Sequence, residues 1–382
     1  MKVLHLIDSG GLYGAERMLL ALVKEQLDAG LDPIILSAGE IGIDSKPIEL
    51  EAMRLNLPLK VWRMRPGLNL KAAKEIRLWA ADIGIELFHS HGFKFNVLMG
   101  LFWHKRNVPL ISTFHGYLHA PRFSKLWLYE KLDRLSALRI DSLVLVGEAM
   151  RHELPDFVLS KKNVVSIRNG LDIERVKEMA KSSLAPKTNV FFKSHEPLII
   201  GVGRLSPEKG FDNLLMAFTK IKENFSTAGL VLAGDGPERA RLEKMAKELG
   251  LSDDVLFLGY VENIPALMAR SSILVMPSFS EGLPITLLEA LTLKVPVVAS
   301  SVGEIPILLE EGVGFLLKNN GDYIEIADSV SSVLVNINAL GDSLNYGYRR
   351  IVDYFSASMM SKKYTDQYKR LLRNYSLNKV DV

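Results

Sequence analysis

The 382-residue chain contains no cysteine. Without thiols it has neither a disulfide framework nor a thiolate metal site, and we expect a reducing compartment. It also lacks a run of about 18 apolar residues, so no segment is expected to span a membrane. Residues 2–8 form a short strand-like segment without the apolar core and cleavage site of a signal peptide. A cytoplasmic location follows as an expectation.

No internal repeat or low-complexity tract is found, and the composition is ordinary for a globular protein, with 48% hydrophobic and 24% charged residues. The length is too great for one core. The net charge of +3 divides into +6 over residues 1–190, −7 over 191–360 and +4 over 361–382. The basic ends suit an anionic partner, or are simply a solvated surface. No interleaved aromatics or known motif supports nucleic acid as a partner.

Short apolar runs alternate with amphipathic segments along the chain, and the pattern restarts after a polar, broken stretch at 182–188. This βαβ rhythm predicts an α/β protein with two doubly wound, Rossmann-like domains. We expect domains over 1–185 and 186–355, followed by a helix within 356–382. In such sheets ligands bind beyond the C-terminal ends of the strands. We therefore expect a cleft between the domains and examine the loops that follow strands. The expected strands lie at 3–7, 33–36, 87–90, 110–113, 142–146, 164–167, 198–203, 230–234, 255–259, 273–277 and 295–299. The expected helices lie at 15–29, 46–55, 70–83, 95–104, 122–138, 173–181, 211–223, 238–249, 264–270, 286–291 and 322–339.

Two carboxylates flank an expected helix start in the segment 280–290. Glu281 follows the strand at 273–277, and Pro284 suits a first helical turn because proline has no N–H to leave unpaired. Glu289 lies about one turn into the helix. The free N–H groups between the two glutamates offer a site for an anion. Such an arrangement suits a ligand with many hydroxyls and a phosphate, for example a nucleotide-sugar.

Two basic residues frame another strand end in the second half. Gly203-Arg204 ends a strand, and Lys209-Gly210 precedes a helix. Arginine forms bidentate hydrogen bonds to phosphate oxygens, and lysine acts as a point charge. Both side chains can therefore converge on one diphosphate. A solvated charge pair is the alternative. Gly234, after the next strand, either lines a nucleotide or turns the chain.

The first half offers weaker signals. The glycines at 10, 11 and 14 allow close backbone approach to a phosphate, but they match neither a dinucleotide fingerprint nor a P-loop, and a flexible turn is the alternative. His115 follows a strand and either contacts a sugar or is packed. His89 and His91 share one strand face. A metal pair there lacks an identifiable third ligand, so we expect both to line the cleft and expect no metal.

Together these residues resemble the family 4 retaining glycosyltransferases, of the group 1 type with a GT-B fold. The similarity covers nearly the whole chain in order, and its most specific parts are the two glutamates spaced by seven residues and the Arg204 to Lys209-Gly210 segment. The other matching pieces are Gly10-Gly11 with Glu16-Arg17, Thr113-Phe114-His115-Gly116, Ile167-Arg168-Asn169-Gly170-Leu171-Asp172, Leu232-Ala233-Gly234-Asp235-Gly236-Pro237 and Phe257-Leu258-Gly259-Tyr260.

The resemblance implies a role for each matching residue. Glu281 would contact the donor sugar, Glu289 the ribose, and Arg204 and Lys209 the diphosphate, with His115 near the transferred sugar. The remaining donor contacts would be Gly11, Gly203, Gly234, Tyr260, Gly282, Leu283, Pro284, Ile285 and Thr286. Glu16 and His91 would lie on the acceptor side. Leu283-Pro284 departs from the aromatic-glycine pair of many members, so the donor sugar does not follow from the resemblance.

The implied reaction is transfer of a hexosyl or N-acetylhexosaminyl group from a nucleotide-diphosphate donor to a glycan or lipid-linked acceptor. The expected donor is a UDP-sugar, because UDP-sugars are frequent donors in the family. This places the protein in cell-surface polysaccharide, lipopolysaccharide or glycoconjugate synthesis. Cations of the protein would replace a metal, because no trustworthy Asp-x-Asp site is present, and no cofactor is expected. Leu126-Trp127-Leu128-Tyr129, set among basic residues, suggests peripheral contact with an anionic membrane on its inner face. A core-facing helix is the alternative.

Rival interpretations remain at this point. An epimerase or phosphorylase of the same fold would act on a nucleotide-sugar without transferring it to an acceptor. A non-catalytic nucleotide-sugar-binding subunit would need no intact set of Arg204, Lys209, Glu281 and Glu289. A dehydrogenase is disfavoured because no dinucleotide fingerprint follows the first strand. A glycosidase with two catalytic carboxylates is disfavoured because Glu289 would be committed to the ribose.

Overall fold

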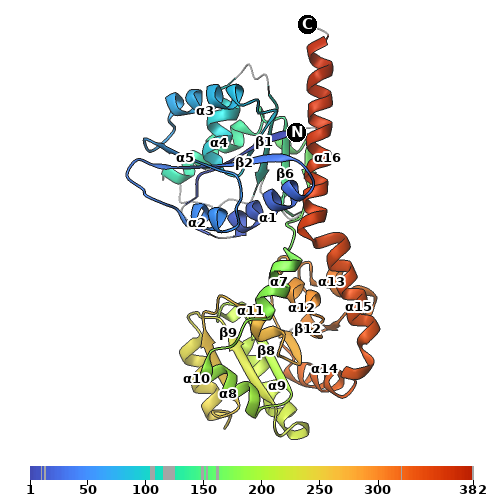
Figure 1. The fold of residues 1–382 in the computed structure, drawn as a ribbon. Helices are drawn as coiled ribbons and strands as arrows, with labels where there is room; N and C mark the ends of the chain where they lie inside the picture. Colours follow the sequence, from blue (N-terminus) through green and yellow to red (C-terminus); the bar gives the residue numbers. More distant parts are fainter. Residues whose placement is uncertain are drawn as a thin grey trace. The chain divides into compact units, whose positions relative to one another are not determined.

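The computed structural model divides the chain into two compact units, and each is described by itself (Figure 1). It describes residues 1–9, 11–12, 14–103, 108–114, 125–147, 150–151, 154–160, 163–319 and 321–380. The N-terminal unit comprises Met1–Gly170 and Ala357–Val382, and the C-terminal unit comprises Leu171–Ser356. No helix in the described part of the chain is both long and apolar enough to cross a membrane.

The N-terminal unit is built on a seven-stranded parallel sheet with strand order β3-β2-β1-β4-β5-β6-β7. Alternate residues of β1 face opposite sides, so Val3 joins one core and Leu4 the other. Helices α1, α2 and α16 cover the first face. Helices α3, α4 and η1 cover the second face, and α5 packs on α4 and η1. The strands are β1 (Lys2–Ile7), β2 (Asp32–Glu40), β3 (Leu59–Met64), β4 (Leu87–Ser90), β5 (Leu110–Phe114), β6 (Ser142–Leu145) and β7 (Val164–Ser166). The helices are α1 (Gly14–Asp28), α2 (Pro47–Arg54), α3 (Leu70–Asp82), α4 (Phe93–Phe95), η1 (Asn96–Leu101), α5 (Lys125–Ser136), α6 (Asp156–Leu159) and α16 (Ala357–Val380).

The C-terminal unit repeats this plan with a six-stranded parallel sheet in the order β10-β9-β8-β11-β12-β13. One face packs on α9, α10 and α14, and the other on α7, α11, α12 and α13. The strands are β8 (Leu198–Val202), β9 (Gly229–Ala233), β10 (Val255–Gly259), β11 (Ile273–Met276), β12 (Val297–Ser300) and β13 (Phe315–Leu317). The helices are α7 (Ile173–Ala180), α8 (Pro186–Ser194), η3 (Pro207–Lys209), α9 (Phe211–Asn224), α10 (Arg239–Glu248), α11 (Ile264–Met268), α12 (Ile285–Thr292), α13 (Ile305–Leu309), η4 (Glu310–Gly312), α14 (Tyr323–Val335), η5 (Ile337–Ala339), α15 (Gly341–Arg350) and η6 (Ile351–Phe355).

The division between the units differs from the expected boundary at 185 and 186. It lies at Gly170 and Leu171, because α7 buries Val176 against the C-terminal core and packs on α11 and α12. The stretch at 182–188 is therefore no linker between units, and α8 begins within it at Pro186. The returning helix α16 packs against α1 in the N-terminal unit.

Both sheets have a topological switch point, where the strand order reverses. In the N-terminal unit it lies between β1 and β4, and in the C-terminal unit between β8 and β11, which are neighbours in each sheet. Doubly wound sheets bind ligands beyond the C-terminal ends of the strands at such points. These two places are therefore where functional side chains are sought.

Candidate active site

The switch point of the C-terminal unit brings the predicted Lys209 and Glu281 together. Lys209 ends η3, which follows β8, and Glu281 lies in the loop after β11. The Lys209 Nζ lies 2.7 Å from Glu281 Oε1, and the Ser278 hydroxyl donates to the same oxygen at 2.7 Å. The Glu281 side chain is only 9% exposed. Lysine and glutamate thus fix each other beside the strand ends.

Two glycines allow the loops of this site to approach closely. Gly210 has a φ of 64° at the start of α9, and a Cβ there would lie 2.3 Å from the carbonyl oxygen of Pro277. A Cβ on Gly234, after β9, would lie 1.8 Å from the carbonyl oxygen of Gly203. The backbone of the β8 loop therefore touches the β9 loop on one side and, through η3, the β11 loop on the other.

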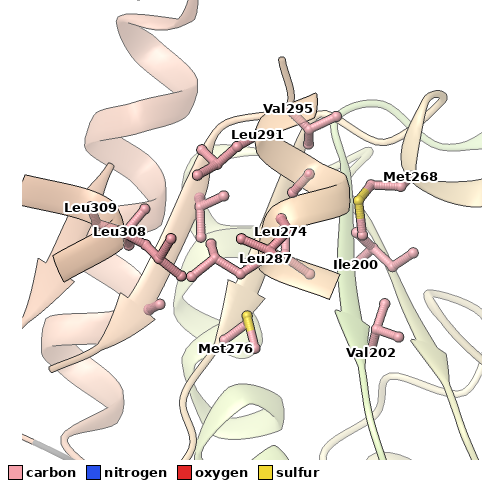
Figure 2. Close-up of a cluster of buried hydrophobic side chains, with 14 of the residues drawn as sticks. Ile200, Val202, Met268, Leu274, Met276, Leu287, Leu291, Val295, Leu308 and Leu309 are labelled. Carbon is pink, nitrogen blue, oxygen red and sulfur yellow. The ribbon is translucent and has the colours of Figure 1, made fainter. Parts of the chain in front are cut away.

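The helix α12 is anchored by an apolar face. Leu287 and Leu291 are buried against the sheet near Leu274 and Ile200 (Figure 2). Pro284 is the N-cap residue, so it stands one position before the first helical turn, and Ile285 begins the helix. Glu289 follows on the same helix and is half-buried. The sequence-based placement of Glu281 before and Glu289 within the helix is confirmed.

Other residues predicted for this site lie at the same sheet edge. Arg204 is exposed directly after β8, and Tyr260 is 77% exposed directly after β10. The amide of Gly234 donates to the carbonyl of Gly259 at 2.8 Å, so the loops after β9 and β10 are joined. Among residues 282–286, which lead into α12, Gly282 and Ile285 are exposed, Leu283 and Thr286 are half-buried, and Pro284 is buried.

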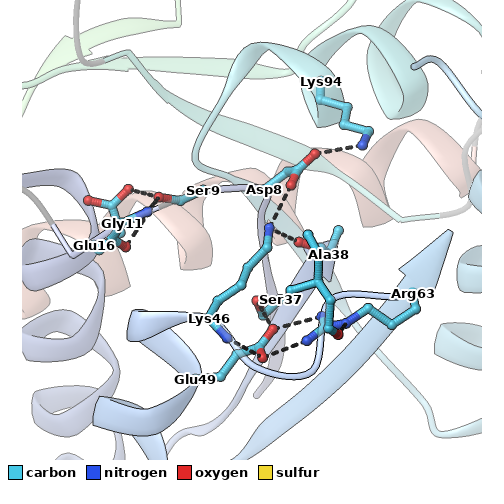
Figure 3. Close-up of polar contacts among 11 residues, drawn as sticks. Asp8, Ser9, Gly11, Glu16, Ser37, Ala38, Lys46, Glu49, Arg63 and Lys94 are labelled. Carbon is cyan, nitrogen blue, oxygen red and sulfur yellow. Dashed lines mark hydrogen bonds and ion pairs between the residues drawn. The ribbon is translucent and has the colours of Figure 1, made fainter. Parts of the chain in front are cut away.

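In the N-terminal unit, Glu16 holds the loop that contains Gly11. The Ser9 hydroxyl bonds to the Glu16 carboxylate and accepts a hydrogen bond from the Gly11 amide at 3.2 Å (Figure 3). Glu16 is buried, at 6% exposed. Through the Ser9 hydroxyl, the Glu16 carboxylate therefore helps to hold the Gly11 amide in place before α1. The predicted site residue His115 lies outside the described residues.

The expectation that His89 lines a cleft is wrong, because His89 is fully buried and His91 is 5% exposed. The third imidazole missing from the sequence argument is His5, the direct neighbour of His89 in the sheet. Its Nδ1 lies 3.0 Å from His91 Nε2, and its Nε2 lies 2.8 Å from Gln26 Oε1. Burial lowers the pKa of His5 to about 4, more than the hydrogen bond to Gln26 raises it.

These contacts orient the protons of the histidine cluster. Neutral His5 donates from Nε2 to Gln26, so its Nδ1 accepts from His91. Gln26 donates to the Tyr368 hydroxyl at 3.2 Å, and that hydroxyl donates to His89 Nδ1 at 2.7 Å. His89 Nε2 then donates to Thr113 at 2.7 Å. Both ring nitrogens of His5 and His89 are engaged in this way, and the three imidazoles offer ligand atoms within 4.8 Å of one another.

A charged constellation at the switch point of this unit was missed in the sequence. Asp8, directly after β1, pairs with Lys46 Nζ at 2.9 Å and Lys94 Nζ at 2.6 Å (Figure 3). Burial raises the pKa of Asp8, but hydrogen bonds and charge from both lysines outweigh it and hold this pKa below the usual value. The available signal was the position of Asp8 at a strand end.

Comparison with known proteins follows the two units. Residues 13–175 match glycosyltransferase family 4, and residues 187–349 match glycosyl transferases group 1. The chain is 26% identical to N-acetyl-alpha-D-glucosaminyl L-malate synthase of Bacillus anthracis over 273 residues, 72% of this chain and 71% of that protein. It is 24% identical to 2-deoxystreptamine N-acetyl-D-glucosaminyltransferase of Streptomyces fradiae over 400 residues, 95% of this chain and 90% of that protein.

The fold has a counterpart among solved structures. Anabaena HepE in complex with UDP superimposes with a TM-score of 0.73 at 20% identity, covering 97% of this chain and 100% of that one. The family matches occupy both halves of the chain in order, and Arg204 and Glu281 lie in the loops after β8 and β11. The chain therefore belongs to the group 1, family 4 glycosyltransferases of the GT-B fold.

Proposed function

We propose that the protein transfers a hexosyl or N-acetylhexosaminyl group from a UDP-sugar to a glycan or lipid-linked acceptor, with retention of configuration and without a metal. The observation that carries this proposal is the Lys209–Glu281 pair at the switch point of the C-terminal unit, with Arg204 exposed beside it. Cations and a carboxylate held together suit a ligand with both phosphate and hydroxyl groups.

Lys209 and Arg204 are suited to a leaving diphosphate. Glu281 occupies one of the three N–H donors of Lys209, and the other two, for which the described residues supply no acceptor, are open to phosphate oxygens. The exposed guanidinium of Arg204 offers a planar fork for the same group. Negative charge grows on the diphosphate as the glycosidic bond breaks, and fixed cations stabilise that charge. This electrostatic task is the reason for proposing metal-independent transfer.

Glu281 is suited to gripping the sugar. Both of its hydrogen bonds, from Lys209 and Ser278, end on Oε1, and of the described residues none donates to Oε2. An ionised carboxylate oxygen accepts hydrogen bonds from hydroxyl groups, so Oε2 is available to sugar hydroxyls. Glu289, further along α12, is proposed for the ribose, and Tyr260 for the base. We assign His115 to the transferred sugar on the resemblance alone.

The proposed base is uridine. HepE, which has the same fold, is described in complexes with UDP and with UDP-glucose. Mycobacterial relatives named as GDP-mannose-dependent mannosyltransferases are 32% identical over 149 residues, so a guanosine donor is the alternative. A thermal-shift panel of UDP- and GDP-sugars separates the two. A larger stabilisation by GDP-sugars would refute the uridine assignment.

The first variants to make are Lys209→Met and Glu281→Gln. We expect each to lower kcat/KM for the UDP-sugar by about 10²–10³, because each removes a fixed electrostatic contact of the transferred group. Lys209→Met should also weaken UDP binding, whereas Glu281→Gln should affect UDP-sugar more than UDP. Turnover of radiolabelled donor and calorimetric titration with UDP measure these effects.

Matched controls are Lys244→Met and Glu248→Gln, both exposed on α10, with Glu248 at the end of that helix. They should leave kcat/KM within about twofold, as surface changes usually do. Wild-type turnover in the Lys209→Met variant would show that this lysine does not stabilise the leaving group.

We also propose peripheral binding to an anionic membrane through the N-terminal unit. Leu128 on α5 is 53% exposed, and Lys131 lies over the Trp127 ring at 5.5 Å. An apolar side chain beside cations suits an interface between water and anionic lipid. Sedimentation with anionic vesicles tests this, and absence of binding at low salt would exclude it.

A further inference from the structure

A pocket of about 200 Å³ lies at the switch point of the N-terminal unit. It is lined by residues that follow four neighbouring strands, and by Tyr129 of α5. The lining includes three charged residues, Asp8, Glu40 and Lys94. It also includes two aromatic residues, Phe93 and Tyr129, and Gly67. Neither acceptor-side residue predicted from the sequence, Glu16 or His91, is among the residues that line it.

A buried ion network holds one wall of this pocket. Arg63 bonds to both oxygens of Glu49, at 2.8 and 2.7 Å, and Glu49 accepts from the Lys46 amide at 3.0 Å. Lys46 Nζ reaches Asp8, and Asp8 reaches Lys94 (Figure 3). Glu49 and Lys46 are 1% and 6% exposed. Buried ion pairs contribute little net stability, so the network's evident effect is to fix the Asp8 carboxylate and Lys94 in place.

Another part of the pocket lining is an apolar, aromatic surface formed by Phe93 and Tyr129. Phe93, the first residue of α4, is 40% exposed, and its ring stacks on Tyr129 with centroids 5.4 Å apart and planes 26° apart. Gly67 has a φ of 82° and a Cβ there would lie 3.8 Å from the Tyr129 hydroxyl, so the loop after β3 runs close to this pair. A backed, exposed ring offers a flat apolar face to a ligand.

The charges of the pocket select against ionic ligands. Lys94 is neutralised by Asp8 at 2.6 Å, and Glu40 adds a second carboxylate to the lining. With Lys46 behind Asp8, two carboxylates and two lysines cancel in formal charge, so a phosphate, a carboxylate or a cation would lose hydration without a net electrostatic gain. Hydroxyl groups, in contrast, donate to the carboxylates and accept from the two Lys94 donors for which the described residues supply no acceptor. The volume is below the 300–1,000 Å³ usual for drug-sized ligands and suits a single ring.

We propose that this pocket binds one uncharged, hydroxylated ring, a pyranose or cyclitol, and that this ring is the end of the acceptor. Assignment of the ring to the acceptor rests on the proposed transferase function, whereas binding of the ring itself does not. Phe93 supplies the stacking face, Asp8 and Glu40 accept from hydroxyls, and Lys94 donates to them.

Nuclear magnetic resonance titration of the full chain with methyl α-glucopyranoside and myo-inositol, in the presence of UDP, measures ring binding. We expect weak, saturable binding of at least one of them. Phe93→Ala should raise its Kd at least about tenfold, because the stacking face is lost. Phe157→Ala on α6, where the phenylalanine is 50% exposed and outside the pocket, is the matched control and should leave Kd unchanged.

Two further comparisons decide the chemistry. Asp8→Asn should raise the Kd about tenfold, since it replaces a charged acceptor. Glucose 6-phosphate and glucosamine should bind less tightly than the uncharged rings. Tighter binding of either charged ring, or equal binding by wild type and Phe93→Ala, would overturn the proposal.

The outcome is distinguishable from failure of the proposed function. Arg204→Ala, in the other unit, should abolish donor turnover but leave ring binding intact. Ring binding without any turnover of a UDP-sugar would uphold the pocket and refute the transferase assignment. Turnover of a UDP-sugar without ring binding that depends on Phe93 would uphold the transferase assignment and refute the proposed role of the pocket.

Discussion

At the scale of single residues, the proposed donor site depends on backbone contacts that admit no side chain. Gly234 and Gly203 touch through their main chains, and Gly210 touches Pro277 in the same way. These contacts set how closely the loops after β8, β9 and β11 approach. They position the Lys209–Glu281 pair without contributing a functional group of their own.

Replacing Gly234 by alanine should therefore be severe. The added Cβ would lie 1.8 Å from the Gly203 carbonyl oxygen, at a φ of 148°. We expect a loss of about 3 kcal/mol or more in the free energy of unfolding, as for a strongly overpacked site, measured by denaturant titration. Gly341→Ala, where a Cβ meets nothing within 4 Å, should change it by less than about 0.5 kcal/mol. Equal effects of the two substitutions would contradict the steric argument.

The pairing of Lys209 with Glu281 also changes how their roles are understood. Sequence analysis assigned one to the diphosphate and the other to the sugar, as independent contacts. The structure joins them at 2.7 Å, so each fixes the other while keeping free hydrogen-bonding capacity. The loss of either residue is consequently expected to disturb the contacts made by its partner.

At the scale of elements, α16 is attached to the N-terminal unit by hydrogen bonds of buried side chains. Tyr364 and Tyr368 are fully buried in the N-terminal unit, and their hydroxyls bond to Thr113 and His89. Gln26 of α1 joins the same chain of hydrogen bonds. Burial raises the pKa of both tyrosines, Tyr364 and Tyr368, so their hydroxyls remain protonated donors.

Tyr368→Phe should weaken the attachment of α16. It leaves His89 Nδ1 without its donor and Gln26 without its acceptor in a buried place, which costs about 1–3 kcal/mol. Hydrogen exchange should show the largest increase in α16 and β4. Tyr354→Phe, at a tyrosine that is 61% exposed, serves as the control. Unchanged protection of α16 in Tyr368→Phe would show that apolar packing alone holds the helix.

At the scale of the whole molecule, two units share one sheet topology but differ in their expected response to acid. His5 in the N-terminal unit is neutral, with its pKa lowered by burial to about 4, whereas an unfolded histidine titrates near pH 6.5. Between these values the unfolded chain binds a proton that the folded chain does not. The contribution of His5 to the folding stability of the N-terminal unit should therefore fall as the pH decreases from about 6.5 to about 4, and stay level below that range.

The shift corresponds to a loss of about 3 kcal/mol for this unit, measurable by denaturant unfolding across pH 4–7. His5→Gln should flatten this part of the pH profile, whatever its effect on absolute stability. His195→Gln, in the C-terminal unit, should leave the profile of the N-terminal unit unchanged. A His5→Gln profile as steep as the wild type would assign the acid sensitivity to other groups.

The sequence predicted much of this organisation, with definite errors. Most strands and long helices lie where hydrophobic periodicity placed them, for example β11 at Ile273–Met276. The edge strands β3 and β13 were missed, as were α8, α13 and α15. Leu59–Met64 mixes charged and apolar residues because an edge strand is only half covered, so it gives a weak periodic signal.

The sequence by itself determined the two doubly wound halves, the positions of the strand-end loops, and the family. It did so because a buried parallel strand must be apolar and an amphipathic helix repeats its apolar residues about every 3.6 positions. Glutamate, arginine and glycine at strand ends can likewise be recognised from the neighbouring sequence alone. Only the tertiary structure decided which distant side chains meet. Because β1 lies beside β4, His5 joins His89, Asp8 joins Lys94, and an aromatic pocket forms that no local pattern encodes.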